Sequence, residues 1–197
     1  MTALTRTQIY NGVLREVGTF RLDDWNENAP AADILTDVWE IARGNCLVMD
    51  DWHFATRIKA LARLVATPDA KWDYFYGYPS AFIKLQTISV YDTLSPELED
   101  YDLLNEGIAC SEDSLYLQFT FDHDTVGEWP PYFSSLMIAE LGCLSVAALK
   151  SETVRERFEK LKADRLAKAR TYNSMQRPTR NLGSGSWVAA ARGQRVR

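Results

Sequence analysis

Residues 129–149 read WPPYFSSLMIAELGCLSVAAL, and this stretch decides the fold. Proline suits the first turn of a helix, where its missing N–H costs nothing, so we expect a helix over about 131–150. Apolar residues lie on nearly all sides of this helix rather than along one stripe. That pattern is typical of a buried helix, so it predicts a helix at the centre of the fold.

A second helix is expected near the N-terminus, over about 5–18. Thr5 and Gln8 have the spacing of a capping box, in which each side chain bonds to the backbone of the other residue. Apolar residues then recur at helical spacing, and Gly18 is suited to the end of the helix.

Two further helices are predicted, over about 30–49 and 152–175. Pro30 fits the first turn of the earlier one, whose apolar stripe is broad enough to be buried on more than one side. The later helix has one narrow apolar stripe and a charged opposite face, which is typical of a helix packed along one side.

A small β region is predicted between these helix pairs, over about 52–122. Residues 52–66 fit both a strand and a helix, and we favour paired strands because Pro68 and its polar neighbours then form a turn. β-Branched and aromatic residues favour further strands, over about 71–78, 80–91, 101–104, 108–110 and 115–121.

Four aromatic residues alternate along the expected strand over 71–78. Successive side chains of a strand point to opposite faces, so one face is predicted to carry all four. This face suits a packed sheet, a contact between subunits or a contact with another component. The four residues are Trp72, Tyr74, Tyr76 and Tyr78.

The expected fold class is therefore α+β. We predict a four-helix body, made of two N-terminal and two C-terminal helices, with a small antiparallel β region inserted between them. Residues 1–176 form this domain, and residues 177–197 form an extended C-terminal arm.

The composition is that of an ordinary globular protein, with 197 residues, 46% of them hydrophobic and 25% charged. No apolar run approaches the roughly 18 residues that a membrane span needs, so we expect no contact with a membrane. Cys46, Cys110 and Cys143 are widely spaced in apolar stretches. They are predicted to be buried free thiols rather than a disulfide framework.

Charge is distributed unevenly along the chain. Residues 150–197 contain thirteen Lys and Arg and four Asp and Glu, a net charge of +9, whereas residues 1–149 carry −14. Residues 176–197 have five arginines and no acid, with three glycines and one proline. They fit either an unstructured terminus or an arm that binds an acidic partner or nucleic acid.

The arm hypothesis is favoured by a tryptophan, because a large apolar ring in a solvated segment usually contacts something. The candidate residues for binding a partner or a neighbouring subunit are Arg177, Arg180, Trp187, Arg192, Arg195 and Arg197.

Signals for catalysis and for cofactors are weak. No glycine-rich phosphate loop or nucleophile turn is present. Asp122-His123-Asp124 is the one local group that could hold a metal, but adjacent residues of a strand do not face one way, so a polar turn is expected. His53 is expected to be a hydrogen-bonded structural residue. We predict no enzyme activity, no cofactor and no metal, although distant residues could still assemble an active site.

Several segments carry a family resemblance through their order and spacing. They are Trp52-His-Phe-Ala55, Trp72-x-Tyr-x-Tyr-x-Tyr-Pro79, Phe82-Ile-Lys-Leu85, Leu115-Tyr-Leu-Gln-Phe-Thr-Phe121, Trp129-Pro-Pro-Tyr-Phe133, Ser186-Trp187 and Ala191-Arg-Gly193. Over about residues 1–193 the chain resembles the head-to-tail adaptor proteins of tailed bacteriophages, including the tail tubular protein A type.

The resemblance implies a structural role in the neck of a virion. Such proteins form a ring, typically of twelve copies, that joins the portal to the nozzle or tail tube and continues the DNA channel. Their helices form the ring body, the β region tends to face the next tail component, and the C-terminal segment tends to bind the portal or a neighbouring subunit. No catalysis is implied.

The acidic body is compatible with this role. A ring of acidic subunits presents a negative wall, and DNA then passes without the Lys and Arg contacts that bind phosphates. The alternative hypothesis is a nucleic-acid-binding module that uses the basic C-terminal helix and tail. The acidic body and the lack of a known groove-reading motif count against it.

Overall fold

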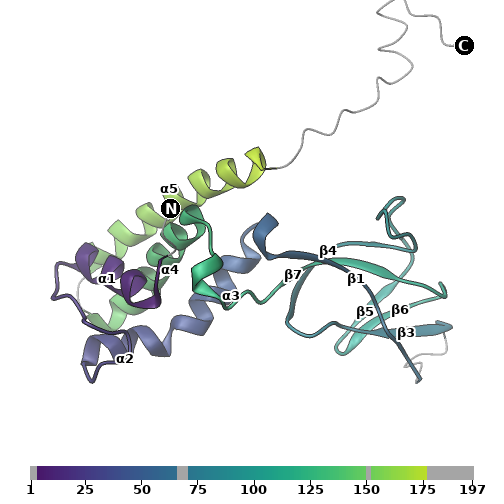
Figure 1. Ribbon diagram of the computed structural model, residues 1–197, viewed down its shortest axis with the longest axis horizontal. Coiled ribbons are helices and arrows are strands. Elements are labelled where there is room, and N and C mark those ends of the chain that lie inside the picture. The colour runs from purple at the N-terminus through teal and green to yellow at the C-terminus, as the bar shows by residue number, and fades with distance from the viewer. Residues whose placement is uncertain (1–3, 66–70, 150–151, 177–197) are drawn as a thin grey trace, which may run out of the picture.

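The computed structural model describes residues 4–65, 71–149 and 152–176. It confirms the α+β class, with helices at one end of the molecule and antiparallel sheets at the other (Figure 1). The α-helices are α1 (Arg6–Val17), α2 (Pro30–Asp37), α3 (Trp39–Val48), α4 (Pro131–Leu149) and α5 (Glu152–Met175). Within the described ranges, no helix is long and apolar enough to cross a membrane.

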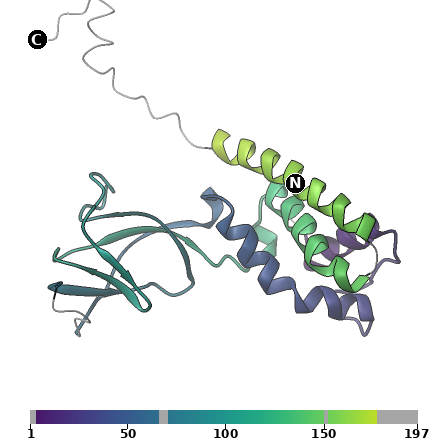
Figure 2. The same ribbon diagram turned by 180° about the vertical axis from the view of Figure 1, so that it is seen from behind.

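Helix α4 lies at the centre of the helical part, as its sequence predicts. Helices α1, α2, α3 and α5 all contact it, and Figure 2 shows α5 on one side of it and α3 on the other. Phe133, Leu136, Met137 and Leu141 of α4 are completely buried. Removing this apolar surface from water on every side of one helix supplies the main driving force for assembling the helices.

The ends of α1 form as predicted. Thr5 Oγ1 accepts a hydrogen bond from the Gln8 amide at 3.2 Å, and Gln8 Oε1 accepts one from the Thr5 amide at 2.8 Å. Gly18 ends the helix with φ +81°, a left-handed conformation that favours glycine.

The prediction of a single helix over 30–49 is wrong in one respect, because α2 and α3 are separate helices that meet at Val38. The backbone of Val38 has φ −99° and ψ −1°, away from the ideal helical values of about −63° and −42°. The break allows both Leu35 and Trp39 to be buried. Neither glycine nor proline marks it, and the apolar spacing continues through it, so the sequence pattern does not reveal it.

The prediction that this helix is buried on more than one side is also wrong. Ile41 and Val48 of α3 are 57% and 47% exposed. Helix α3 packs through its buried side, which includes Trp39 and Leu47, so a partly apolar outer face is left in contact with solvent.

Two antiparallel sheets form the β region. One has the strand order β1-β7-β4 and the other β2-β3-β6-β5. The strands are β1 (Thr56–Ala60), β2 (Arg63–Leu64), β3 (Tyr74–Gly77), β4 (Phe82–Ser89), β5 (Asp102–Leu104), β6 (Gly107–Cys110) and β7 (Tyr116–Phe121). All the predicted strands after residue 71 are present, although several are shorter than expected.

The favoured interpretation of residues 52–66 is confirmed in part. β1 and β2 are strands, but His53–Ala55 is a short 3₁₀ turn that precedes them. The turn expected around Pro68 lies outside the described residues, and so does the predicted arm over 177–197.

Gly142 tests how closely α4 and α5 must pack. A Cβ atom at this position would overlap the ring of Phe158, which is 1% exposed on α5. We expect Gly142→Ala to destabilise the protein by about 1–3 kcal/mol, because overpacking moves side chains out of their preferred positions. Urea unfolding measures this change.

Gly44→Ala is the matched control. A Cβ atom at Gly44 meets nothing within 4 Å, so the higher helix propensity of alanine should leave stability unchanged or raise it by up to about 1 kcal/mol. Equal effects of the two substitutions would contradict tight packing at Gly142.

Candidate functional site

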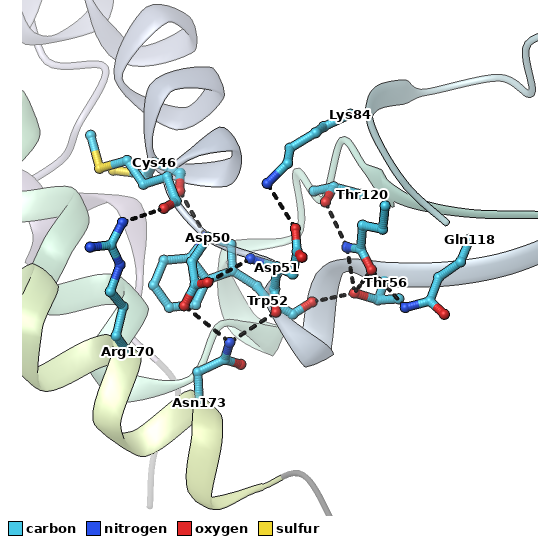
Figure 3. Close-up of polar contacts among 12 residues, drawn as sticks. Cys46, Asp50, Asp51, Trp52, Thr56, Lys84, Gln118, Thr120, Arg170 and Asn173 are labelled. Atoms are coloured by element: carbon cyan, nitrogen blue, oxygen red, sulfur yellow. Dashed lines mark hydrogen bonds and ion pairs between the residues drawn. The ribbon is translucent and has the colours of Figure 1, made fainter. Parts of the chain in front are cut away.

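The strongest polar site among the described residues lies where the helices meet the sheets. Two chain segments cross this junction, residues 49–55 between α3 and β1 and residues 122–130 between β7 and α4. Figure 3 shows side chains from α5, β1, β4 and β7 that gather around the first segment. We define the junction by these two segments and the side chains that bind them.

Asn173 of α5 holds the first segment through three hydrogen bonds. Its Nδ2 donates to the Asp51 carbonyl at 2.9 Å and to Asp50 Oδ2 at 3.3 Å (Figure 3). Its Oδ1 accepts from the His53 amide at 3.1 Å. The side chain is buried, with 4% of the residue exposed. Buried polar groups that lose a partner are costly, so these bonds restrict the segment to one path.

Charged side chains fix the same segment from two further directions. Arg170 of α5 donates to the Met49 carbonyl at 2.8 Å, at the end of α3. Lys84 of β4 binds Asp51 Oδ1 at 2.7 Å. The segment is therefore connected to α5 on one side and to the β1-β7-β4 sheet on the other.

Trp52 anchors the segment in the helical core. It is completely buried, and its indole N–H donates to the Cys46 carbonyl at 2.8 Å. Its ring meets that of Phe133 at 5.6 Å and 75°, an edge-to-face arrangement that aromatic rings prefer. The chain therefore leaves α3 in a direction set by packing against α4.

A polar ladder continues from the junction across the β1-β7-β4 sheet. Thr56 Oγ1 donates to the Trp52 carbonyl at 2.7 Å. Gln86 Nε2 donates to Thr56 Oγ1 at 3.0 Å and to Thr120 Oγ1 at 2.9 Å, and Gln118 donates to Gln86 Oε1 at 2.7 Å. All three strands of the sheet contribute side chains to this ladder. It therefore joins the whole sheet to the start of β1.

The second crossing segment is held by a bidentate pair. Arg43 of α3 donates from Nε and Nη2 to the two Asp122 oxygens at 2.9 and 2.8 Å. Such paired bonds fix orientation as well as distance. Trp129 further along the segment donates to the His123 carbonyl at 2.9 Å. Both crossing segments are therefore bound to α3 and its surroundings.

The polar turn expected at Asp122-His123-Asp124 does not form, because these residues continue as irregular chain after β7 and His123 is buried. Asp122 binds Arg43, and His123 stacks on Phe121 with ring centroids 5.1 Å apart. In the part of the chain that the structure describes, no group of three or more His, Cys, Asp or Glu residues could hold a metal ion.

All three thiols are free, as predicted, but burial is confirmed only for Cys46 and Cys110, because Cys143 is half-buried. Burial raises the pKa of the Cys46 thiol well above its ordinary value, and the nearby Glu140 carboxylate adds to the rise. A thiol with a raised pKa stays protonated at neutral pH and is a poor nucleophile.

The aromatic face predicted for the strand over 71–78 does not form as expected. β3 begins only at Tyr74, so the alternation does not extend back to Trp72. Trp72 instead packs beside Phe75, away from the main core that contains Tyr76. Tyr76 is 1% exposed and Trp72 is 6% exposed, so both rings are buried inside the protein and are closed to an outside partner.

Tyr74 and Tyr78 are the half-buried members of this group. The ring of Tyr78 stacks on Phe82 with centroids 4.4 Å apart, and the Arg63 guanidinium lies 3.9 Å from the Tyr74 ring centroid. These two residues remain candidates for an outside contact. The arm residues Arg177, Arg180, Trp187, Arg192, Arg195 and Arg197 lie outside the described residues.

The sequence singles out His53 and Asp122 separately but does not predict that the junction brings them to Asn173 and Arg43. Arg43 and Asp122 are 79 positions apart, and Asn173 is 120 positions from His53. Asn173 stands four positions after Ala169, in line with the apolar stripe of α5, so its place on that stripe was an available signal of burial. The adjacent Asp50 and Asp51 before a tryptophan were the nearest available signal.

No protein family model matches the chain, and neither does any curated protein.

Asn173→Ala tests the junction. The substitution removes the bonds from Asn173 to the His53 amide and to the Asp51 carbonyl. We therefore expect a loss of about 1–3 kcal/mol in the free energy of unfolding. Faster hydrogen exchange at the His53 amide should accompany it. Ser174→Ala, at the exposed neighbouring position, is the control and should change neither quantity, whereas equal effects would show that Asn173 does not hold the segment.

Asp102 gives a pH-dependent test of the sheet. The Trp72 indole N–H donates to Asp102 Oδ2 at 2.6 Å, and this bond, with help from Lys71, lowers the pKa of the carboxyl below its ordinary value. A lowered pKa in the folded state stabilises the protein above the unfolded pKa of about 4, and this contribution disappears as pH falls through the folded pKa.

We therefore expect Asp102→Asn to be less stable than the wild-type protein at pH 7 and to approach it at pH 3. Urea unfolding at both values measures the difference. A difference that does not change with pH would show that the carboxylate charge has no part in the contact.

Proposed function

We propose that the protein is a structural connector that forms a ring at the head-to-tail junction of a tailed phage virion. In this role it joins the portal to the nozzle or tail tube and continues the DNA channel. A dodecamer assembled in the host cytoplasm is the expected form. The proposal rests on the family resemblance and on one structural observation, the two-ended shape held by the junction.

The two ends differ in architecture, which suits a protein that contacts different neighbours at each end. The helices pack around α4 at one end, and the sheets extend away from them at the other (Figure 1). Polar contacts to both crossing segments hold the ends at a fixed angle. A ring component needs such a fixed angle, because each subunit must repeat the same geometry around the axis.

The position of α5 fits a role for the C-terminal arm in binding the portal. α5 ends beside the junction, where Arg170 and Asn173 contact residues 49–53. The C-terminal end of α5, at Met175, therefore lies near the middle of the molecule, between its two ends (Figure 1). A glycine-containing, arginine-rich segment can order on an acidic surface, trading conformational entropy for contact area.

Nucleic-acid binding is the second candidate function, and the net charge of +9 over residues 150–197 favours it. Phosphate contacts make such binding fall steeply with salt. A connector should show little affinity for duplex DNA at physiological salt. Strong binding that weakens steeply as salt is raised would favour the second candidate.

Electron microscopy of the protein, alone and mixed with the portal protein of the same phage, tests the connector proposal. We expect a ring, or a collar added beneath the portal, whose rotational symmetry gives the copy number. A chain lacking residues 177–197 should keep its fold, seen by circular dichroism, but should not join the portal. Absence of any assembly with the full chain, with the portal present, would contradict the proposal.

A further inference from the structure

A groove crosses the outer face of the β1-β7-β4 sheet, next to the junction. It has a volume of about 570 Å³, and its lining includes Ile58 of β1, Gln86 of β4 and Gln118 of β7. Ile58 and Gln118 lie opposite each other in the sheet register. Leu117 and Phe119 are buried on the other face, because successive side chains of a strand alternate. We call this hollow the sheet groove.

The two ends of the sheet groove have different acids in their walls. Asp51 of the first crossing segment lines the end near α5, and Glu97, in the loop after β4, lines the other. Lys84 of β4 binds Asp51 at 2.7 Å, and the Leu98 amide donates to the Ile88 carbonyl of β4 at 2.9 Å. Lys84 and Ile88 are four positions apart, so roughly 13 Å of strand lies between the two ends.

The end at Glu97 carries negative charge that no neighbour balances. Glu97 is exposed, and no described Lys or Arg forms an ion pair with it. Residues 92–100 around it contain four Asp and Glu and no Lys or Arg. None of the described residues that line the groove is Lys or Arg. Arg57 of β1 points to the other face, where its guanidinium lies 3.7 Å from the Phe121 ring centroid. A basic segment therefore complements this end of the groove.

The segment that follows α5 has this complementary chemistry. Residues 177–197 contain five arginines and no acid, with Trp187 near the middle. The three arginines that come after Trp187 are Arg192, Arg195 and Arg197. The groove presents the same order as it is met from α5, because the apolar side chain of Ile58, which is 56% exposed, comes before the acids of residues 92–100.

Helix α5 ends beside the near end of the sheet groove. Asn173 donates to the Asp51 carbonyl and accepts from the His53 amide, and both Asp51 and His53 line the groove. Figure 3 shows Asn173, Asp51 and Gln118 in this order from α5 out to the sheet. The last described residue, Gln176, is therefore three positions beyond a residue that bonds to the groove wall.

The chain after Gln176 is long enough to extend along the groove. Ile58 is five positions beyond His53, which places it at most about 18 Å away. Trp187 is eleven positions beyond Gln176, and an extended chain of that length spans up to about 36 Å. A tethered segment meets such a site at an effective concentration on the order of 1 mM. Contacts that are individually weak, such as exposed ion pairs, are then sufficient to hold it.

We infer that residues 177–197 bind the sheet groove of their own molecule. Trp187 packs against Ile58, and the arginines after it pair with the acids of residues 92–100. The indole supplies a large apolar contact, and bonds between arginine and carboxylate groups fix its direction. The inference goes beyond the connector proposal and holds without it. In a connector it adds a step, which rests on the proposed function, because the arm must leave its own groove before it binds the portal.

Fluorine NMR of the full chain tests the contact at Trp187. Incorporation of 5-fluorotryptophan gives one signal for each of the six tryptophans, and Trp187→Phe identifies the signal of Trp187. A synthetic peptide of residues 177–197 gives the position of this signal in the absence of the groove. The other five signals, which include those of the buried Trp39, Trp52, Trp72 and Trp129, report whether each variant is folded.

Two variants change the groove, and two matched controls change the other sheet. Ile58→Glu places a charge on the apolar part of the groove, and Glu97→Arg reverses the charge at its acidic end. Leu103→Glu is the control for the first, because Leu103 is 53% exposed on β5. Glu106→Arg is the control for the second, because Glu106 is exposed between β5 and β6. Neither control residue lines the groove.

We expect the Trp187 signal of the wild-type chain to lie away from its position in the peptide. It should stay there on dilution, because the contact lies within one molecule. Both controls should keep the displaced signal. Ile58→Glu and Glu97→Arg should each return the signal to the peptide position, as loss of a central contact requires.

Three results would overturn the inference. The first is a wild-type Trp187 signal at the peptide position. The second is a displaced signal that both groove variants retain, which assigns the contact to another surface. The third is a displacement that disappears on dilution, which indicates the groove of a second molecule. The connector proposal is judged separately, by the full chain and the portal in the electron microscope, since a ring or collar can form whichever of these results is obtained.

Discussion

Helix α4 has no polar side to turn toward water, and the arrangement of the helices depends on this constraint. Its buried residues include Phe133, Leu136 and Met137, and leaving one side uncovered would expose a large apolar surface. Four other helices therefore contact it. The contact with α5 is close enough that Gly142 is required beside the Phe158 ring.

The one acid of α4 depends on these neighbours. Glu140 is 2% exposed, with Asn45 of α3 donating to Oε1 at 2.8 Å and Lys162 of α5 lying 2.6 Å from Oε2. A buried carboxylate without such partners is strongly destabilising. The same group thus requires α3 and α5 to lie on either side of α4.

The position of the sheets follows from a second set of contacts, between side chains that are distant in sequence. Asn173, Arg43 and Lys84 each reach a crossing segment from a different element. Without them the two short segments could take several paths, because short loops have few contacts of their own. A connector that transmits position from one end to the other requires this fixed path.

The sequence by itself determined the α+β class, the central helix, the capped ends of α1 and most strands, because these depend on local periodicity and on turn and cap residues. The break at Val38 could not be predicted, since the apolar spacing runs through it. Alternation suggested one face for Trp72 and Tyr76, but only the tertiary structure showed where β3 begins and that the two rings pack apart. The junction brings together residues from separate elements. Its existence was decided by which helix sides α4 must bury, a property of three-dimensional packing that no local pattern records.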